Sequence, residues 1–214
     1  MYHLRPRELI ASLDVELFGP NPLQHSMASI GIALFQGRQL LDTFSVNLAE
    51  RKGTERHPQT MRGFWDRHPA LLTEVTTNVI EPSVAMNRIA EWLMYWYSHG
   101  FKVSWVAKPA CVDWGFFKSY FDTFVTVECP PLTHYCHDMA AMLRTVCLLH
   151  PQLTNHRITE ALCHGRRVTH RALDDALAQG FVFVELNYVL EQGLPLLPYL
   201  KEKTESVPDT HKKT

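Results

Sequence analysis

Carboxylates stand inside apolar or helix-forming stretches at three separated places in this chain, and no other feature constrains the fold as strongly. The three islands are Leu13-Asp14-Val15-Glu16, Val112-Asp113-Trp114 and His170-Arg171-Ala172-Leu173-Asp174-Asp175. An isolated carboxylate is costly to remove from water, so a cationic group has to meet it where it is desolvated. If the fold gathers the three islands, a pair of divalent metal ions can meet all of them. That arrangement points to hydrolysis of phosphodiester bonds.

Composition limits the classes of function that remain. The chain has 214 residues, of which 46% are hydrophobic, and this suits one α/β domain with a sizeable core. Its formal net charge is −1, which does not fit a protein that coats long duplexes with a basic face. A protein that grips only the last few nucleotides of a strand does not need such a face.

The cysteines and the N-terminal residues predict the compartment. The five cysteines (Cys111, Cys129, Cys136, Cys147 and Cys163) show no CxxC spacing. No signal-peptide stretch follows Met1, and no run approaches the ~18 apolar residues of a membrane span. We therefore expect an intracellular, cytoplasmic protein with free thiols and no membrane partner.

Apolar patterning predicts the strands and helices. The expected strands span 9–13, ending at Asp14, and then 27–35, 39–48, 101–106 and 132–136, with a hairpin turn at 36–38. The expected helices span 83–97, with Ser83 as N-cap and Gly100 closing the helix, and then 111–124, 139–149 and 171–190. Gly180 is a weak point in the last helix, and residues 49–69 are expected to form a polar excursion over the surface.

The order βββαβαβαα predicts an α/β layered domain with a mixed central sheet of about five strands flanked by helices. Asp14 would lie on the first, central strand, and Asp113 and Asp175 on later helices. Pro195 and Pro198 are expected to end the regular structure. Residues 1–200 would then form a single domain and residues 201–214 a flexible polar tail.

Geometry explains why these acidic residues suit metal ions. Asp14 and Glu16 are two positions apart, so on an extended strand both side chains project from one face. Asp113 and Asp175 can add ligands once their helices pack beside that strand. Oxygen ligands favour hard cations, so we expect two divalent metal ions, Mg²⁺ or Mn²⁺. His170, just before its helix, is the candidate general base that takes a proton from water.

The three islands resemble the exonuclease motifs of the DEDDh 3′–5′ exonucleases, which have an RNase H-like fold. Residues 13–19 are similar to the first motif and residues 107–114 to the second. His170 followed five positions later by Asp175 is close to a signature form of the third. The resemblance covers roughly residues 9–190. Phe64-Trp65 after a polar stretch also resembles the phage-type and RNase T-like exoribonuclease branch.

The resemblance implies a role for each matching residue. Asp14, Glu16, Asp113 and Asp175 would hold the metal ions and His170 would activate water, while the spacing selects Asp175 rather than Asp174. Contacts to the terminal nucleotide would come from Leu17, Phe18, Trp65 and Lys108, with Arg166 or Arg167 beside a phosphate. Leu17 replaces a frequent threonine and Val112 a frequent phenylalanine, which puts the grip on that nucleotide in doubt.

Plainer interpretations of several residues stay open. Phe18 and Trp65 are equally well explained as core or loop-anchoring residues, and Lys108 and the arginine pair as solvated charges. A zinc site is a rival metal hypothesis, but its candidate ligands have irregular spacing. These candidates are His134, Cys136, His137, Cys147, His150, Cys163 and His164.

The sequence therefore predicts a metal-dependent 3′–5′ exonuclease that acts on single-stranded 3′ ends, with RNA preferred over DNA. A catalytically silent nucleic-acid-binding or adaptor domain on the same fold is the main alternative. An endonuclease on the RNase H-like fold is the third and less favoured alternative, because the His170–Asp175 spacing resembles the exonuclease pattern specifically. Related enzymes often dimerise, so a homodimer is an open alternative by analogy.

Overall fold

Five strands form one mixed sheet in the computed structural model, which describes residues 7–206. The strands are β1 (Glu8–Leu17), β2 (Met27–Gln36), β3 (Gln39–Asn47), β4 (Lys102–Ala107) and β5 (His137–Asp138). Their order across the sheet is β3-β2-β1-β4-β5. β2 pairs antiparallel with β1 and β3, whereas β4 pairs parallel with β1 and β5. This result confirms the predicted α/β class and the mixed sheet, with β1 at its centre.

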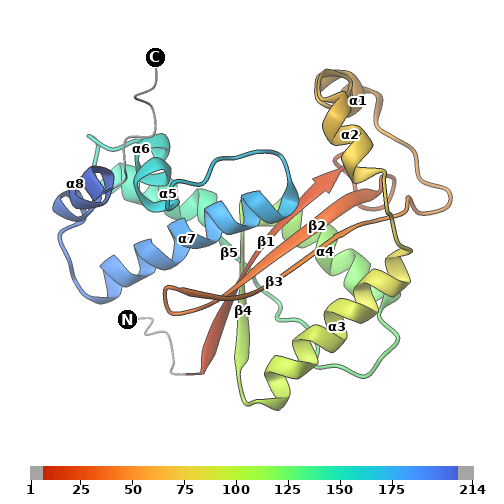
Figure 1. Cartoon of the computed structure of the whole chain (residues 1–214), viewed down its shortest axis with the longest axis horizontal. Helices are drawn as coiled ribbons and strands as arrows, with labels where there is room; N and C mark the ends of the chain where they lie inside the picture. The colour runs from red at the N-terminus through yellow and green to blue at the C-terminus, as the bar shows by residue number, and fades with distance from the viewer. Residues whose placement is uncertain (1–6, 207–214) are drawn as a thin grey trace.

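Helices cover both faces of the sheet (Figure 1). They are α1 (Pro58–Gly63), the 3-10 helix η1 (Trp65–Arg67), α2 (Pro69–Val75), α3 (Pro82–Ser98), α4 (Ala110–Phe124), α5 (Met139–Leu149), α6 (Asn155–Leu162), α7 (Ala172–Glu191) and α8 (Leu196–Ser206). α3 and α4 pack on one face of the sheet. α7 crosses β1 and β2 on the other face, with α5, α6 and α8 beside it.

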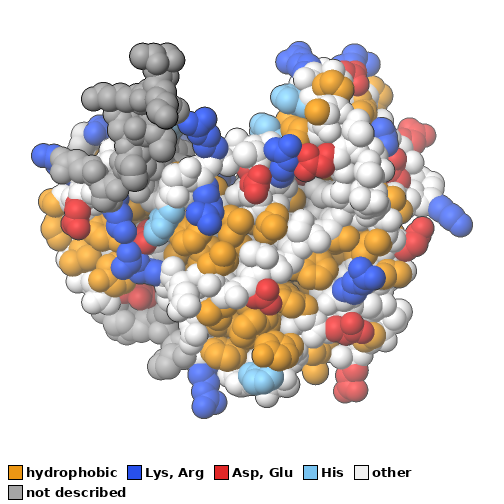
Figure 2. All heavy atoms as spheres, in the orientation of Figure 1, with side chains coloured by type: hydrophobic (Ala, Val, Ile, Leu, Met, Phe, Trp, Pro, Cys, Tyr) orange, Lys and Arg blue, Asp and Glu red, His pale blue; other side chains and the backbone are white. Residues whose placement is uncertain are grey.

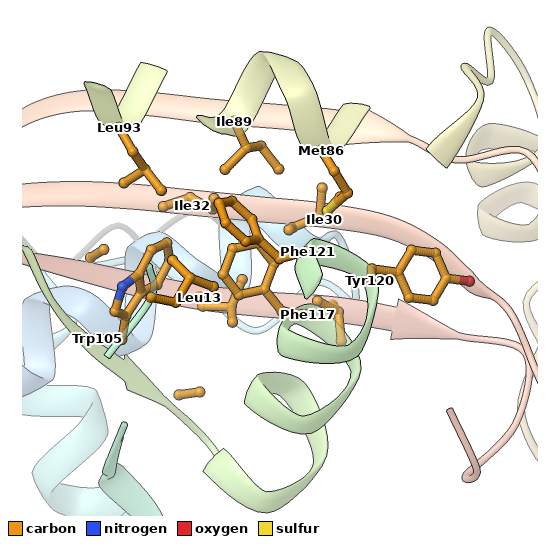
Figure 3. Packing of buried hydrophobic residues seen from close by; sticks show 14 of the residues in the cluster. Leu13, Ile30, Ile32, Met86, Ile89, Leu93, Trp105, Phe117, Tyr120 and Phe121 are labelled. Atoms are coloured by element: carbon orange, nitrogen blue, oxygen red, sulfur yellow. The ribbon is translucent and has the colours of Figure 1, made fainter. Parts of the chain in front are cut away.

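Alternation along β1 separates the two faces. Leu13 and every second residue before it belong to the core under α3 and α4. Figure 3 shows this core, in which Met86 and Ile89 from α3 and Phe117 from α4 pack over the sheet. The intervening positions of β1 face α7. The alternation therefore sends the side chains of Asp14 and Glu16 to the α7 side.

Two glycines let α7 approach the sheet closely. A Cβ atom at Gly180 would lie 2.4 Å from Cε2 of Phe35 on β2. A Cβ atom at Gly31, also on β2, would lie 2.3 Å from the carbonyl carbon of Ala172 at the start of α7. The prediction that Gly180 weakens the last helix is wrong, because α7 continues through it and the glycine serves helix–sheet contact.

Several predicted boundaries also need correction. The first strand continues past Asp14 to Leu17, and the last strand is His137–Asp138 rather than 132–136. α3, the first helix that the sequence predicted, begins at Pro82 with Glu81 as its N-cap, so Ser83 is not the N-cap. Residues 49–69 contain α1 and η1, and α6 was not predicted. Short helices of this kind carry too little periodicity to stand out in a sequence.

The C-terminal prediction is also wrong in part. Pro195 and Pro198 do not end the regular structure, because α8 runs to Ser206 with Leu196 and Leu200 buried against the α7 side of the core. A proline is tolerated in the first turn of a helix, where its missing N–H group has no partner to lose. The rest of the predicted tail, residues 207–214, lies outside the described residues.

Among residues 7–206, no helix combines the length and apolar character that crossing a bilayer requires. All five cysteines are free thiols.

Candidate active site

The first part of the site lies on β1 and is built by the sheet. Asp14 pairs with Gly31 and Glu16 with Ser29 on β2, so hydrogen bonds between strands fix the backbone of both acidic residues. Because Gly31 lacks a side chain, the first turn of α7 lies directly against the sheet beside Asp14. The same glycine therefore brings the third motif to the first.

The second part lies at the start of α4, where β4 ends. Asp113 is in the first turn of this helix and is buried, and its carboxylate accepts a hydrogen bond of 3.3 Å from the backbone N–H of Lys108. Asp138, which caps α5, accepts from the backbone N–H of Ala110 at 3.1 Å. The two carboxylates thus hold the β4–α4 connection from both sides.

The third part lies at the start of α7. The carboxylate of Asp175 accepts hydrogen bonds from the backbone N–H groups of Thr169, at 2.8 Å, and His170, at 3.2 Å. Asp174 accepts a hydrogen bond from the hydroxyl of the same Thr169 at 2.9 Å. His170 has φ +57°, an unfavourable region for a residue with a side chain. The hydrogen bonds to Asp175 hold the loop in that conformation and keep His170 beside the acid.

The three parts converge at the end of β1. Glu16, His170 and Asp175 offer ligand atoms that all lie within 4.8 Å of one another. The electrostatic fields of Asp113 and Asp175 both act on Asp14 and on Glu16. The fold therefore brings together all five residues that the sequence predicted for the catalytic centre.

Because the carboxylates are buried and converge, the pKa values of Asp14 and Glu16 on β1 are raised. Burial, followed by the charges of Asp175 and Asp113, raises the pKa of Glu16 to about 8. Burial also raises the pKa of Asp14 well above its ordinary value, and the neighbouring carboxylates add to this rise, whereas Lys108 lowers it. Like charges held together in a desolvated place disfavour ionisation.

The pKa values of Asp113 on α4 and Asp175 on α7 are also raised, although hydrogen bonds to backbone N–H groups oppose the rise. Burial raises the pKa of Asp113 to about 7, against the opposing effect of the Lys108 N–H group and with a contribution from Asp138. Burial also raises the pKa of Asp175, although its two backbone hydrogen bonds and the charge of His170 act in the opposite direction.

This donor set fits divalent metal ions. Four carboxylates meet, and the charge of Lys108 compensates Asp14 only in part. Carboxylate oxygens are the ligands that Mg²⁺ and Mn²⁺ prefer. Within residues 7–206, the histidines and cysteines considered for zinc form no group of three or more converging ligands.

Residues 57–76, which are far from the third motif in the sequence, contact the loop that carries His170. Phe64 contacts the ring of His170 edge-on, with ring centroids 4.9 Å apart, and His68 lies 5.9 Å from it. Arg171 pairs with Glu74 of α2 at 2.8 Å. The segment thus supports the loop that carries His170.

The predicted substrate contacts have different environments. Phe18 and Trp65 are both fully buried and pack on each other at 5.6 Å, and Trp65 donates from Nε1 to the carbonyl oxygen of Leu17 at 3.0 Å. Their rings are thus enclosed by protein, which matches the core and loop-anchoring interpretation. Leu17 is half-buried and Lys108 exposed.

Sequence reasoning missed the supporting residues. Gly31 interrupts a strand pattern, and an isolated strand glycine is a known sign of close backbone approach. Gln179, buried on α7, donates to the carbonyl oxygen of Leu13 at 2.7 Å. Nothing in the sequence connects His68 or Glu74 with a loop about a hundred residues later.

Several solved nuclease structures share the fold of this chain. The RNase domain of the yeast Pop2 protein superposes with a TM-score of 0.59 at 11% identity, covering 86% of this chain and 78% of that one. The nuclease domain of 3′hExo, a DEDDh family member bound to rAMP, gives 0.53 at 14% identity, covering 86% and 92%. The E. coli ExoI–ssDNA complex, in its zinc-bound form, gives 0.59 at 13% identity, covering 92% of this chain and 42% of that one.

These identities are low, so the likeness establishes the fold, which is the RNase H-like fold of the DEDDh exonucleases. Residues 10–186 match the family described as the 3′-5′ exoribonuclease Rv2179c-like domain. The match spans most of the chain, and the chain belongs to that family. Among curated proteins, none matches this sequence.

Proposed function

We propose that this protein is a metal-dependent 3′–5′ exonuclease that removes mononucleotides from single-stranded RNA. The observation that carries the proposal is the meeting of Asp14, Glu16, Asp113, Asp175 and His170 at the end of β1. Family membership supports an exoribonuclease. The 3′hExo structure with rAMP supports an RNA end, whereas the ExoI complex with ssDNA keeps DNA as the comparison substrate.

The carboxylates and the histidine divide the work. Asp14, Glu16, Asp113 and Asp175 would hold two divalent ions, Mg²⁺ or Mn²⁺. When bound, such ions stabilise the negative charge of the attacking and leaving oxygens. His170 would take the proton of the attacking water, since its ring already lies beside Glu16 and Asp175. His170 is exposed, so water and the strand end would reach the carboxylates from its side of the site.

Two exposed or half-buried residues would hold the terminal nucleotide. Leu17 follows Glu16 directly and offers apolar surface to a base or sugar. Lys108 lies close enough to influence Asp14 and would meet the phosphate on the 5′ side of that nucleotide. Phe18 and Trp65 would act through Leu17, whose carbonyl oxygen Trp65 holds.

A cleavage assay tests the proposal. 5′-Labelled single-stranded RNA and DNA are incubated with the protein and Mg²⁺, Mn²⁺ or a chelator. We expect a ladder that shortens from the 3′ end, faster on RNA and absent with the chelator. The ladder should disappear in His170→Ala and in Asp175→Ala.

Two other outcomes would replace the proposal. Intact substrate that stays bound to the protein would favour the catalytically silent binding domain. Products from internal cuts would favour an endonuclease on the same fold.

A further inference from the structure

We propose that a row of side chains that cover α7 binds the backbone of the substrate strand as it leads away from the catalytic centre. This inference rests on the proposed function and extends it to nucleotides beyond the terminal one. The binding surface, here called the basic row, consists of Arg166, His164, Arg38 and Lys203. Figure 2 shows Lys, Arg and His side chains following α7 toward α8 on the viewed face.

The basic row starts about two helical turns along α7 from Asp175 and follows the helix away from the catalytic centre. Arg166 and His164 both lie over the ring of Phe181, with the guanidinium carbon 4.5 Å from its centroid and the imidazole stacked at 4.5 Å. At ~1.5 Å per residue, Phe181 lies roughly 9 Å along α7 from the metal-ligand position 175. The row is therefore placed for phosphates upstream of the scissile one.

A buried carboxylate organises the far part of the row. Glu185 on α7 has a side chain 1% exposed. It accepts from Nε and Nη2 of Arg38, at 3.0 and 2.8 Å, and from Nε2 of His164 at 3.0 Å. Tyr199 also donates to it, and Lys203 lies 3.7 Å away. These partners come from the β2–β3 hairpin, the loop after α6 and α8, so one acid fixes the positions of two cationic side chains and an imidazole.

The numbers of cationic and acidic side chains around Glu185 favour a surface that binds phosphate groups. Arg38 and Lys203 both adjoin Glu185, and Arg166 lies over Phe181, four positions earlier on α7. Glu202 is the carboxylate among the residues that line the adjoining cavity. The three cations named here outnumber these two carboxylates. A strand whose end enters a cluster of carboxylates needs such an attraction.

The cavity beside the row combines cations with aromatic surface. It has a volume of about 400 Å³ and is lined by Arg38, Tyr188, Leu194, Pro195, Pro198, Tyr199, Glu202 and Lys203. The guanidinium of Arg38 lies 4.5 Å from the ring centroid of Tyr188, and Lys203 lies 5.5 Å from that of Tyr199. Phosphate-binding cations beside aromatic faces are typical of single-strand binding sites. We infer that one upstream nucleotide occupies this cavity.

Substrate length provides the test. The double variant Arg166→Gln/Lys203→Gln is compared with Arg88→Gln, a matched loss of charge on α3 across the sheet. Binding of a fluorescent single-stranded RNA 20-mer is followed by anisotropy over a range of salt concentrations, and cleavage is measured on the 20-mer and on a dinucleotide. Thermal melting checks that each variant is folded.

We expect at least ~10-fold weaker binding of the 20-mer by the double variant. The slope of log K against log salt should fall in magnitude by about 1.4, at ~0.7 per lost single-strand phosphate contact. Cleavage of the dinucleotide, whose one phosphate is the scissile one, should fall far less than cleavage of the 20-mer. Arg88→Gln should behave as the unaltered protein on both substrates.

Three results would be decisive in other directions. Unchanged 20-mer binding by the double variant would overturn the inference, and so would an equal loss on the dinucleotide. If the unaltered protein cleaves neither length, the proposed function fails instead, and anisotropy with the 20-mer still decides whether the row binds a strand. If the double variant melts at a lower temperature than the unaltered protein, Arg166→Gln alone is used. The expected change in the slope of log K against log salt is then half as large.

Discussion

The strand half and the loop half of the catalytic centre are built in different ways. Asp14 and Glu16 stand on the central strand, where backbone pairing with β2 and the core beneath fix their positions. His170 and Asp175 stand at the end of a loop that is held by two backbone hydrogen bonds and by contacts with the 57–76 segment. The positions of Asp14 and Glu16 thus depend on the sheet and its core, whereas the position of His170 depends on contacts of a loop.

The largest effect should come from the strand half. Asp14→Asn removes a ligand charge without changing size, and we expect activity to fall at least ~10³-fold, because transition-state charge loses its stabilisation. In the metal-free protein, the same change should raise the melting temperature, because it relieves repulsion among the carboxylates. Single-turnover cleavage and thermal melting measure the two effects. A variant that turns over almost normally would remove Asp14 from the metal site.

The junction between the halves should come next. Gly31→Ala places a methyl group where the start of α7 lies 2.3 Å away, so α7 must shift. We expect a roughly 10- to 100-fold loss of activity and a destabilisation of about 1–3 kcal/mol. The matched control is Gly115→Ala on α4, where nothing lies within 4 Å of the new methyl group. Equal effects of the two substitutions, measured by cleavage and denaturant unfolding, would contradict the contact.

The pH dependence of stability should be a smaller effect, and it reports on the buried carboxylates of the centre. Burial raises the pKa of Glu16 to about 8 and that of Asp113 to about 7, above their values in the unfolded chain. Between pH ~4 and ~8 the folded metal-free protein therefore holds protons that the unfolded chain has lost, and its stability falls as pH rises.

Melting curves from pH 5 to 8 check this. We expect the melting temperature with chelator to fall by several degrees over this window, and the gain on adding Mn²⁺ to be larger at pH 8 than at pH 5. Glu16→Gln should flatten the fall. A fall as steep in Glu16→Gln as in the unaltered protein would mean that this group is not its source.

The smallest effect should come from the ion pair between Glu74 and Arg171, which supports the loop that carries His170. Glu74 and Arg171 are both about half exposed, so breaking their pair should change stability by less than ~1 kcal/mol. We expect Glu74→Arg to lower kcat a few-fold with little change in KM, and Glu74→Arg/Arg171→Glu to restore it. Failure of the reversed pair to restore kcat would show that the pair does not position His170.

The sequence predicted the features of the fold and the site that depend on local patterns, and it missed those that depend on tertiary contacts. Apolar patterning predicted the layered fold, because strands and helices depend on local periodicity. Three short motifs nominated the five residues of the candidate centre through their resemblance to a known family. Phe18 and Trp65 could not be assigned, because an aromatic residue in a polar stretch looks the same whether it packs inward or contacts a base. Burial of these rings depends on where the 57–76 segment lies on the end of β1.

Contacts across long stretches of chain were beyond the sequence. The support of His170 by His68 and the gathering of Arg38, His164 and Lys203 around Glu185 join residues from elements that no local pattern connects. Pro198 suggested a break, yet α8 forms because the apolar side chains of Leu196 and Leu200 pack against the core. Tertiary packing decides in such cases.

Metal binding tests the central claim, that carboxylates from three separate segments form one metal centre, most directly. Mn²⁺ is titrated by calorimetry into the unaltered protein, Asp14→Asn and the neighbouring-charge control Asp174→Asn. We predict that the unaltered protein and Asp174→Asn bind two ions with matching affinity, and that Asp14→Asn loses at least one of them. Binding by Asp14→Asn that is identical to that of the unaltered protein would contradict the account.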